Sequence, residues 1–312
     1  MDGIPSVALL GEGGVMANLQ GMTGRSLQGL QKSLQAFSGF SSDIYISDLN
    51  NNRIVVYDRS FNFAFDFGSF GTGDGDFSGP HGVCVDRSHI FITEQSNNRV
   101  QKFLHDGSFV SKWGSIGSGD TNFSGAGKCE IADQRLYVCD RLNDRIQICS
   151  LDGDFIDRFG VSGTGDGEFD LPQDISFYNG ELYVVDLGNS RVQVFDTDGV
   201  FIRSFGSLGS GDGQLASPFG IDVDASGVYV AEFGNSRVQV LDHNGTYISK
   251  WTTSAPAYDV TIIRGLLLVA EASTLPESYV SVFTKSGSLV DTFSEWGSAD
   301  GQTRIILSAT AI

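Results

Sequence analysis

Short hydrophobic segments recur along most of the chain, each bounded by glycine or by an Asp-Gly pair. In one clear repeat they cover residues 181–186, 191–195, 200–205 and 220–223. These segments are rich in β-branched and aromatic residues and are too short for helices, so they predict strands. Asp198-Gly199 predicts a hairpin turn between the second and third strands, because both residues tolerate positive φ. The remainder of the chain after residue 44 lacks a helical period, so the pattern predicts repeats of four strands.

A polar motif sets the period of these repeats at 46 residues. An acid is followed by Asn at the third position, Arg at the fifth and Ile or Val next. The acids are Asp48, Glu94, Asp140, Asp186 and Glu232; the amides are Asn51, Asn97, Asn143, Asn189 and Asn235; the guanidinium groups are Arg53, Arg99, Arg145, Arg191 and Arg237. A group present in every repeat serves each repeat alike. We therefore interpret the motif as structural, with Arg paired to the acid and Asn bonded to the loop backbone.

A sixth unit without the Asn and Arg follows, with strands over 266–271, 279–283 and 288–293. Six four-stranded units predict a closed ring, because a lone unit cannot bury both faces. The first strand, residues 44–48, has no inner strand before it. Copying the spacing of the earlier repeats places that strand at Ser308–Ile312. We therefore expect the C-terminal strand to complete the first blade and close the ring.

These patterns resemble the NHL-repeat family of six-bladed β-propellers. Over residues 159–193 the resemblance rests on Phe-Gly, a Gly-rich stretch, Phe, a Pro-led inner strand, an aromatic strand ending in Val-Asp, and Asn-x-Arg-Val-Gln-Val. It covers residues 41–312, which we expect to form one all-β propeller domain of four-stranded antiparallel blades. The resemblance implies a binding scaffold more often than an enzyme, although the fold alone does not decide function.

Residues 1–40 precede the predicted propeller as an N-terminal arm. Leu27, Leu30, Leu34 and Phe37 share one helical stripe, which predicts a short amphipathic helix. The helix either packs on the edge of the ring or docks into a partner or a second copy, which would give a homo- or hetero-oligomer. The arm has neither the basic start nor the apolar run of a signal peptide. We expect no membrane insertion, and a location in the cytoplasm or in a larger particle.

The chain carries a net charge of −18 at pH 7, and the arm contributes none of it because its two acids balance its two bases. An acidic ring repels phosphate and anionic lipid, so nucleic-acid binding is disfavoured and a protein partner is expected. The four cysteines fall in or beside strands and predict buried thiols. A disulfide between Cys139 and Cys149 is the open alternative.

Specificity is expected where the repeats differ at one mouth of the ring. The residue after the first position of the inner strand is variable, as is the residue after the motif acid. These positions give a candidate partner-binding patch of His81, Arg141, Gln173, Phe219 and Phe233. Such a mixed polar and aromatic patch resembles a protein surface more than a catalytic pocket. Chance variation among the repeats is the competing interpretation.

Catalytic and metal-binding patterns are weak. A second repeated acid lies in Gly-rich loops, where alternating Gly and Asp can bind calcium only if several carboxylates converge; its positions are Asp74, Asp120, Asp166, Asp212 and Asp300. Only one histidine, His81, maps to an inner strand, and no nucleophile motif is present. We therefore predict a non-enzymatic scaffold with no cofactor, metal or catalytic residues. The alternatives are a structural subunit of a large assembly, such as a virion tail or a cell-surface complex, and a calcium-dependent hydrolase or lyase of the six-bladed type.

Overall fold

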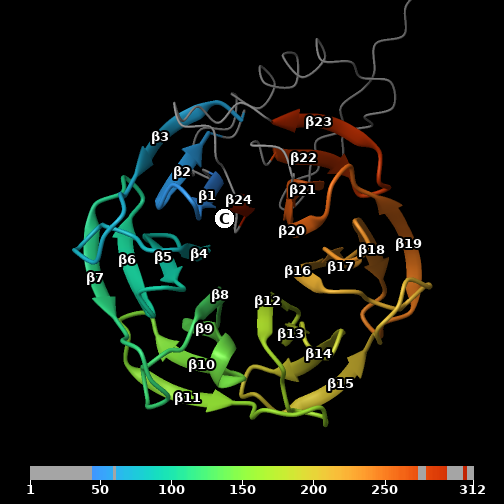
Figure 1. The fold of residues 1–312 in the computed structure, drawn as a ribbon, viewed down its shortest axis with the longest axis horizontal. Coiled ribbons are helices and arrows are strands. Elements are labelled where there is room, and N and C mark those ends of the chain that lie inside the picture. Colours follow the sequence, from blue (N-terminus) through green and yellow to red (C-terminus); the bar gives the residue numbers. More distant parts are fainter. Residues whose placement is uncertain (1–43, 59–60, 273–278, 294–304, 308–312) are drawn as a thin grey trace, which may run out of the picture. The chain divides into compact units, whose positions relative to one another are not determined.

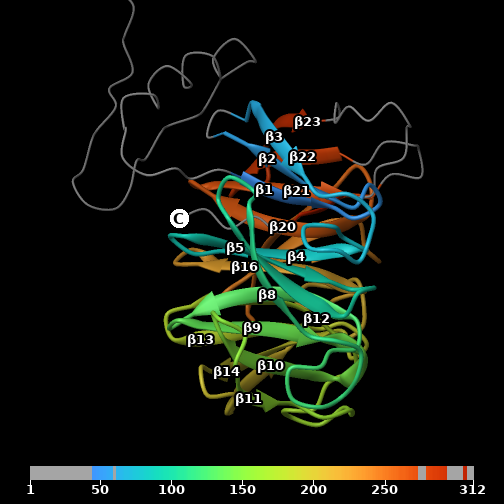
Figure 2. The same ribbon diagram turned by 90° about the vertical axis from the view of Figure 1, so that its left-hand side faces the viewer.

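Six four-stranded antiparallel sheets form the blades of a closed ring (Figure 1). The computed structural model describes residues 44–58, 61–272, 279–293 and 305–307. In each blade one strand faces the central axis and the fourth lies on the outer rim (Figure 1). Figure 2 shows the same ring from its side. The predicted all-β, six-bladed propeller is confirmed, whereas the predicted arm and its helix, residues 1–40, lie outside the described residues.

The strands follow one another from the axis outwards in every blade. The first blade contains β24 (Ile305–Leu307), β1 (Ile44–Asp48), β2 (Arg53–Tyr57) and β3 (Phe63–Phe67). The second contains β4 (Pro80–Val85), β5 (His89–Glu94), β6 (Arg99–Leu104) and β7 (Phe109–Trp113). The third contains β8 (Ala126–Ala132), β9 (Arg135–Asp140), β10 (Arg145–Ser150) and β11 (Phe155–Phe159). The fourth contains β12 (Pro172–Tyr178), β13 (Glu181–Asp186), β14 (Arg191–Asp196) and β15 (Phe201–Phe205). The fifth contains β16 (Pro218–Asp224), β17 (Gly227–Glu232), β18 (Arg237–Leu241) and β19 (Tyr247–Thr252). The sixth contains β20 (Ala257–Ile263), β21 (Leu266–Glu271), β22 (Tyr279–Thr284) and β23 (Leu289–Phe293).

The C-terminal part of the chain closes the first blade, as the sequence predicts. Strand β24 pairs antiparallel with β1, so that Ile306 lies opposite Ser47. The predicted position of this strand was wrong, because Ile306 holds the register position that we expected for Ser308. The connection before β24 is shorter than in the repeat that supplied the spacing. The expected segment Ser308–Ile312 lies outside the described residues.

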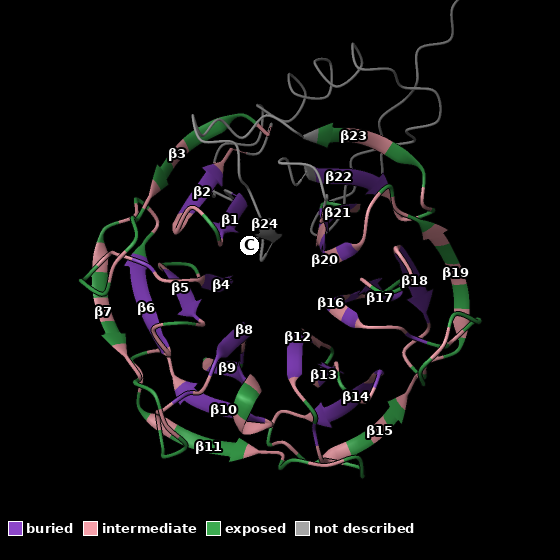
Figure 3. Cartoon of the chain, in the orientation of Figure 1, coloured by how far each residue is buried: buried purple, intermediate pink, exposed green. Residues whose placement is uncertain are grey.

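Each hydrophobic core lies between two neighbouring blades. Tyr45 and Ile54 of the first blade, for example, belong to one buried cluster with Val83 and Ile90 of the second. The closing interface has its own core, in which Ile46 of the first blade meets Leu268 of the sixth. Burying a large apolar side chain contributes about 1.5–3 kcal/mol. Among the residues whose burial is described, the inner three strands of the second to sixth blades, and β1 and β2 of the first, are therefore mainly buried, whereas the outer strands are partly exposed, as Figure 3 shows.

Helical structure in the described residues is limited to one 3₁₀ turn, Arg141–Asn143, between β9 and β10. The turn ends at Asp144, whose φ of 51° places it in the left-handed region. No helix in the described part of the chain is long and apolar enough to cross a membrane. The 3₁₀ turn matters for the site because it begins with Arg141.

Candidate functional site

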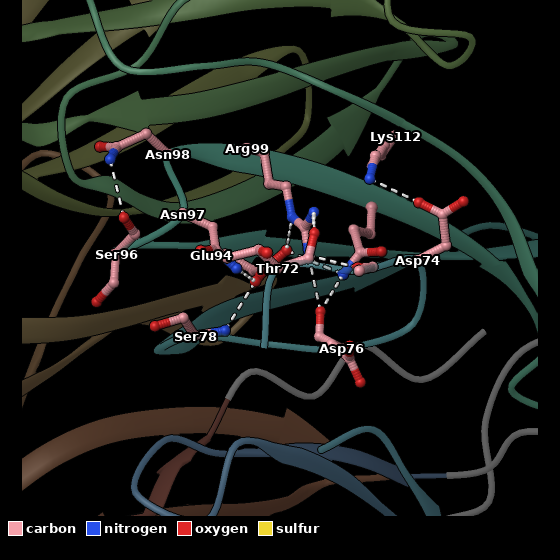
Figure 4. A network of polar contacts seen from close by, with 12 residues as sticks. Thr72, Asp74, Asp76, Ser78, Glu94, Ser96, Asn97, Asn98, Arg99 and Lys112 are labelled. Carbon is pink, nitrogen blue, oxygen red and sulfur yellow. Dashed lines mark hydrogen bonds and ion pairs between the residues drawn. The ribbon is translucent and has the colours of Figure 1, made fainter. Parts of the chain in front are cut away.

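The repeated polar motif forms a buried network at the end of each motif-bearing blade, shown for the second blade in Figure 4. Arg99 is paired through its Nε with the buried Glu94. The same carboxylate accepts from Asn97 Nδ2 at 2.6 Å and from the Ser78 amide at 2.9 Å. The Arg99 guanidinium also donates to the carbonyls of Thr72, Gly73 and Asp76. The motif therefore ties the loop after β5 to the loop before β4.

The pairing of the motif arginine with its acid recurs in all five repeats that carry the motif. A glutamine two residues after the arginine belongs to the same network, and sequence reasoning left it without a role. In the second to fifth blades it donates to the motif acid; these glutamines are Gln101, Gln147, Gln193 and Gln239. In the second to fifth blades no buried oxygen of the motif acid lacks a partner among the described residues, whereas in the first blade Asp48 Oδ1 does.

Variable residues reach the axis because the inner strand of each blade from the second to the sixth begins with a β-bulge. In β12, Pro172 pairs with Asp186 and Asp174 with Val185, so Gln173 is the extra residue. A bulge at the rim of a sheet turns a side chain in a new direction. The same irregularity recurs in the other inner strands of the second to sixth blades, at His81, Gly127, Phe219 and Tyr258. Five blades thus present one bulge residue each at the same end of the ring.

We use the term channel mouth for His81, Arg141, Gln173, Phe219, Phe233 and Tyr258. The first five are the predicted patch, and the structure places them at one end of the inner strands. His81 and Gln173 are only 3% and 2% exposed, so their side chains are buried within the mouth. His81 Nδ1 and Gln173 Oε1 nevertheless have no hydrogen-bond partner among the described residues. Buried polar atoms are normally paired, so these two are available to a ligand.

The Arg141 side chain lies over the bulge position of the third blade, where the bulge residue has no side chain. The bulge residue there is Gly127, and a Cβ on it would lie 2.7 Å from Arg141 Cδ. Glycine is therefore required for the guanidinium to lie over the strand. Arg141 Nε has no partner among the described groups, and burial lowers the pKa of this side chain. Burial lowers the pKa of His81 well below its usual range, and the positive charges of Arg141 and Lys128 lower it further. The imidazole is therefore neutral at pH 7.

An aromatic cluster completes the channel mouth on the side of the fifth and sixth blades. The ring centroid of Phe219 lies 5.6 Å from that of Phe233 and 4.8 Å from that of Tyr258. The Phe233 and Tyr258 centroids are 5.2 Å apart. Sequence reasoning missed Tyr258 because its blade lacks the motif. Its position directly after Ala257, the first residue of the inner strand, was the available signal.

An ionic bridge crosses the ring below the channel mouth. Lys128 Nζ lies 3.0 Å from Asp174 Oδ2 and is also paired with Asp259. Strand β8, which carries Lys128, and strand β20, which carries Asp259, lie on opposite sides of the axis (Figure 1). Burial opposes the charge of Lys128, but the two carboxylates offset it and raise the pKa of the ammonium group. Burial raises the pKa of Asp259 to about 8. The single ammonium group of Lys128 therefore lies between two carboxyl groups that hold a proton between them near neutral pH.

The repeated loop acids spread around the outside of the ring. Asp74, Asp120 and Asp212 each form an exposed ion pair with a base on the outer strand of the following blade. Asp300 lies outside the described residues. In the part of the chain that the structure describes, no three or more His, Cys, Asp or Glu side chains are grouped to hold a metal ion. The calcium hypothesis therefore gains no ligand cluster from these loops.

The thiols are free and buried, and their proximity differs from the pairing left open by the sequence. Cys139 lies opposite Ile146 and Cys149 opposite Leu136, so these two cysteines are not cross-strand partners. Cys84 and Cys129, on the inner strands of neighbouring blades, bring their Sγ atoms to 2.6 Å. Burial and the neighbouring Cys129 raise the pKa of Cys84, so it is protonated at neutral pH.

Comparisons with known proteins agree with this architecture. A family described as NHL repeat matches residues 77–103, and a family described as 6-bladed beta-propeller matches residues 170–264. The search of curated proteins gave no significant match.

Solved structures with the same fold have different roles. A streptogramin B lyase has a TM-score of 0.59 at 15% identity, covering 87% of this chain and 92% of its own. A virginiamycin B lyase from Staphylococcus aureus has a TM-score of 0.57 at 17% identity, covering 75% of each chain. A chain of a nidogen/laminin complex has a TM-score of 0.64 at 18% identity, covering 85% and 96%. At such low identities these similarities establish the fold alone.

Proposed function

Because the chain is a six-bladed β-propeller with NHL repeats, we propose that it is a non-enzymatic binding module whose protein partner inserts an extended segment into the channel mouth. One observation carries the proposal. The mouth combines buried polar atoms that lack partners with an aromatic cluster contributed by the fifth and sixth blades.

The chemistry of these atoms matches a peptide better than a charged small molecule. Arg141 Nε can donate to a carbonyl or carboxylate, whereas Gln173 Oε1 can accept from an N–H. A peptide backbone offers both groups within one residue. Phe219, Phe233 and Tyr258 supply an apolar surface for a neighbouring side chain, and aromatic and arginine anchors are typical of interface hot spots. A chain of a nidogen/laminin complex shares the fold, which is compatible with a binding role.

Selection of a random peptide library on the full-length protein tests this proposal. We expect the enriched peptides to lose at least about tenfold in affinity, or ~1.4 kcal/mol, when Arg141→Ala or Phe219→Ala is introduced. The control is Ile202→Ala on the outer strand β15, where the side chain is 43% exposed. Peptides that bind the control and both mouth variants equally well would place recognition elsewhere on the ring.

A lyase or hydrolase is the second candidate, favoured by two carboxyl groups on the inner strands. Burial raises the pKa of Glu130 to about 8 and that of Asp222 to about 6. Such groups can exchange protons near neutral pH, as general acids and bases must. A lyase that shares the fold acts on streptogramin B. Chromatography of a streptogramin B antibiotic after incubation with this protein tests that substrate: conversion that disappears with Glu130→Gln supports the enzyme, and no conversion removes this substrate class.

The remaining alternative is a subunit of a large assembly, tethered through residues 1–40. Those residues lie outside the part of the chain that the structure describes. Native mass measurement on the full chain and on residues 41–312 separates the two roles. A defined oligomer that only the full chain forms would favour assembly, whereas monomers in both cases would favour the binding module.

A further inference from the structure

A partly open cavity lies along the axis, between the Lys128 bridge and the opposite end of the inner strands. It has a volume of about 250 Å³ and is lined by β8, β12, β16 and β20. Its walls carry Glu130, Ser176, Asp222 and Thr261, which stand at equivalent positions on those four strands. We call this space the lower cavity. It is separate from the channel mouth, because its lining begins at Lys128 and continues away from the bulge residues.

The lower cavity is polar and contains more negative than positive groups. Asp174 and Asp222 join Glu130 in its lining, and Lys128 supplies the cation. Lys128 is already shared by Asp174 and Asp259, and Asp224, which also lines the cavity, is paired with Lys285. Glu130 and Asp222 therefore have no counter-ion in the described lining. Asp222 is held by backbone and hydroxyl donors, including the Ile262 amide at 2.6 Å and Ser176 Oγ at 3.1 Å. Neutral donors stabilise a carboxylate but do not neutralise it.

A further observation, on Thr261, indicates that the lower cavity can take up a hydrogen-bond donor. The Thr261 side chain lines it, is 6% exposed, and bonds to no group in the described part of the chain. Unpaired buried acceptors are rare in native proteins because each costs roughly 1–3 kcal/mol. A ligand that carries N–H donors and a positive charge would satisfy the Thr261 hydroxyl and offset the charge of Glu130 and Asp222.

The arrangement favours an organic cation over a metal ion. No group of three or more acidic, histidine or cysteine side chains in the described residues converges closely enough to hold a metal. The acids are instead distributed over three walls, which suits donors separated by a short chain. A volume of about 250 Å³ lies below the usual range for drug-sized ligands, about 300–1,000 Å³, so the ligand is small.

We propose that the lower cavity binds a small aliphatic ammonium ion, with Glu130 and Asp222 taking its charge and the Thr261 hydroxyl accepting an N–H. The ligand class is therefore a short primary amine or diamine. This site would act independently of partner binding at the channel mouth, so the two proposals can fail separately.

Binding of such a cation should release a proton. The pKa of Glu130 is raised to about 8, first by burial and then by Asp222 and Asp174. The groups facing it are Asp174 and Ser176 on β12, Asp222 on β16, Thr261 and Asp259 on β20, and Lys128 on its own strand. At pH 7 a group with that pKa is protonated in about nine molecules of ten. A bound ammonium favours the carboxylate, so binding releases up to one proton and strengthens as pH rises towards 8.

Titration calorimetry of the full-length protein with 1,4-diaminobutane tests the proposal. It is run at pH 7 with about 0.15 M salt, which screens diffuse attraction to the acidic surface, in two buffers of different ionisation enthalpy. We expect 1:1 binding, measurable release of up to one proton, and no comparable binding of butane-1,4-diol. Glu130→Gln should weaken binding at least tenfold and abolish the proton release, while Thr261→Val should weaken it severalfold and keep the release.

Asp212→Asn is the control, because this acid lies on the exterior with its side chain 56% exposed and should leave the titration unchanged. If Glu130→Gln does not fold, as judged by its melting transition, Thr261→Val carries the test. Absence of 1:1 binding, equal binding of the diol, or binding that neither cavity substitution alters would overturn the proposal.

Discussion

Replacing Lys128 by methionine removes the cation that bridges opposite sides of the ring. The ammonium lies 3.0 Å from Asp174 and is also paired with Asp259, and its side chain is 5% exposed. At an effective dielectric constant of about 20, two unit charges 3 Å apart interact with about 5 kcal/mol. Measured losses on breaking a buried pair are about 3–5 kcal/mol, because the partner stays buried and uncompensated. We expect Lys128→Met to lower the free energy of unfolding by about 3–5 kcal/mol at pH 8.

The loss should depend on pH with a defined sign. Lys128 lowers the pKa of both carboxyl groups against the raising effect of burial, so its removal raises both values further. A carboxyl whose folded pKa exceeds its unfolded value of about 3.9 destabilises the protein progressively as pH rises from the unfolded value, and the full cost is reached above the folded value. The penalty of Lys128→Met should therefore be smaller at pH 5.5, where the carboxyls can stay protonated, than at pH 8.

Urea unfolding at both pH values measures this effect. The control is Lys112→Met, which breaks the exposed pair with Asp74 and should cost less than about 1 kcal/mol. The double variant Lys128→Met/Asp259→Asn should recover part of the loss, since it removes one of the uncompensated carboxylates. A Lys128→Met protein within about 0.5 kcal/mol of the parent at pH 8 would refute this reasoning. So would a loss that is equal at both pH values.

Three further predictions concern the scaffold. Arg145→Met should lower the free energy of unfolding in urea by about 3–5 kcal/mol, because this buried arginine donates to Asp140 and to three loop carbonyls. The control Arg158→Met breaks an exposed ion pair and should cost less than about 1 kcal/mol. Equal losses in the two variants would contradict the structure. Mild oxidation by a small disulfide reagent should join Cys84 to Cys129 in preference to any other pair, as peptide mapping by mass spectrometry would show. Truncation after residue 302 removes β24 and should abolish the single cooperative melting transition of the ring; a truncated chain that melts like the full one would show that closure is dispensable.

The fold was predictable because its signals are local and repeated. The strands, their turns and the motif acids recur at one spacing, so a single blade predicts the others. The closing strand was misplaced because it depends on a loop that occurs once, between residue 296 and Ile305. The pairing of each motif arginine was also predictable, since Arg53 and Asp48 are opposite one another on adjacent strands.

The contents of the channel were much harder to predict. His81, Gln173 and Phe219 could be identified as variable residues from the sequence. The burial of His81 and Gln173, and the absence of hydrogen-bond partners for their polar atoms, depend on the β-bulges, which the sequence does not predict. The contact between Lys128 and Asp259 joins opposite blades, so no local spacing predicts it. An Asp on an inner strand instead suggests a turn or solvent. Charged residues two and four positions after the first residue of an inner strand are the signal that could have been used.

Ring symmetry explains why these inner positions are the best places to look for function. Six equivalent strands converge on one axis, so a charge at a given level of one blade faces the same level of the other five. Where the residues agree, as in the motif network, they serve each blade separately. Where they differ, as with Lys128, Asp174 and Asp259, they combine into one asymmetric arrangement that no single blade contains. Buried charges of this kind are costly for the fold, and a ring could be built with apolar residues at the same level. Their presence on the axis is therefore better explained by binding than by stability, and the stability and calorimetric measurements on Lys128 and Glu130 test the two explanations separately.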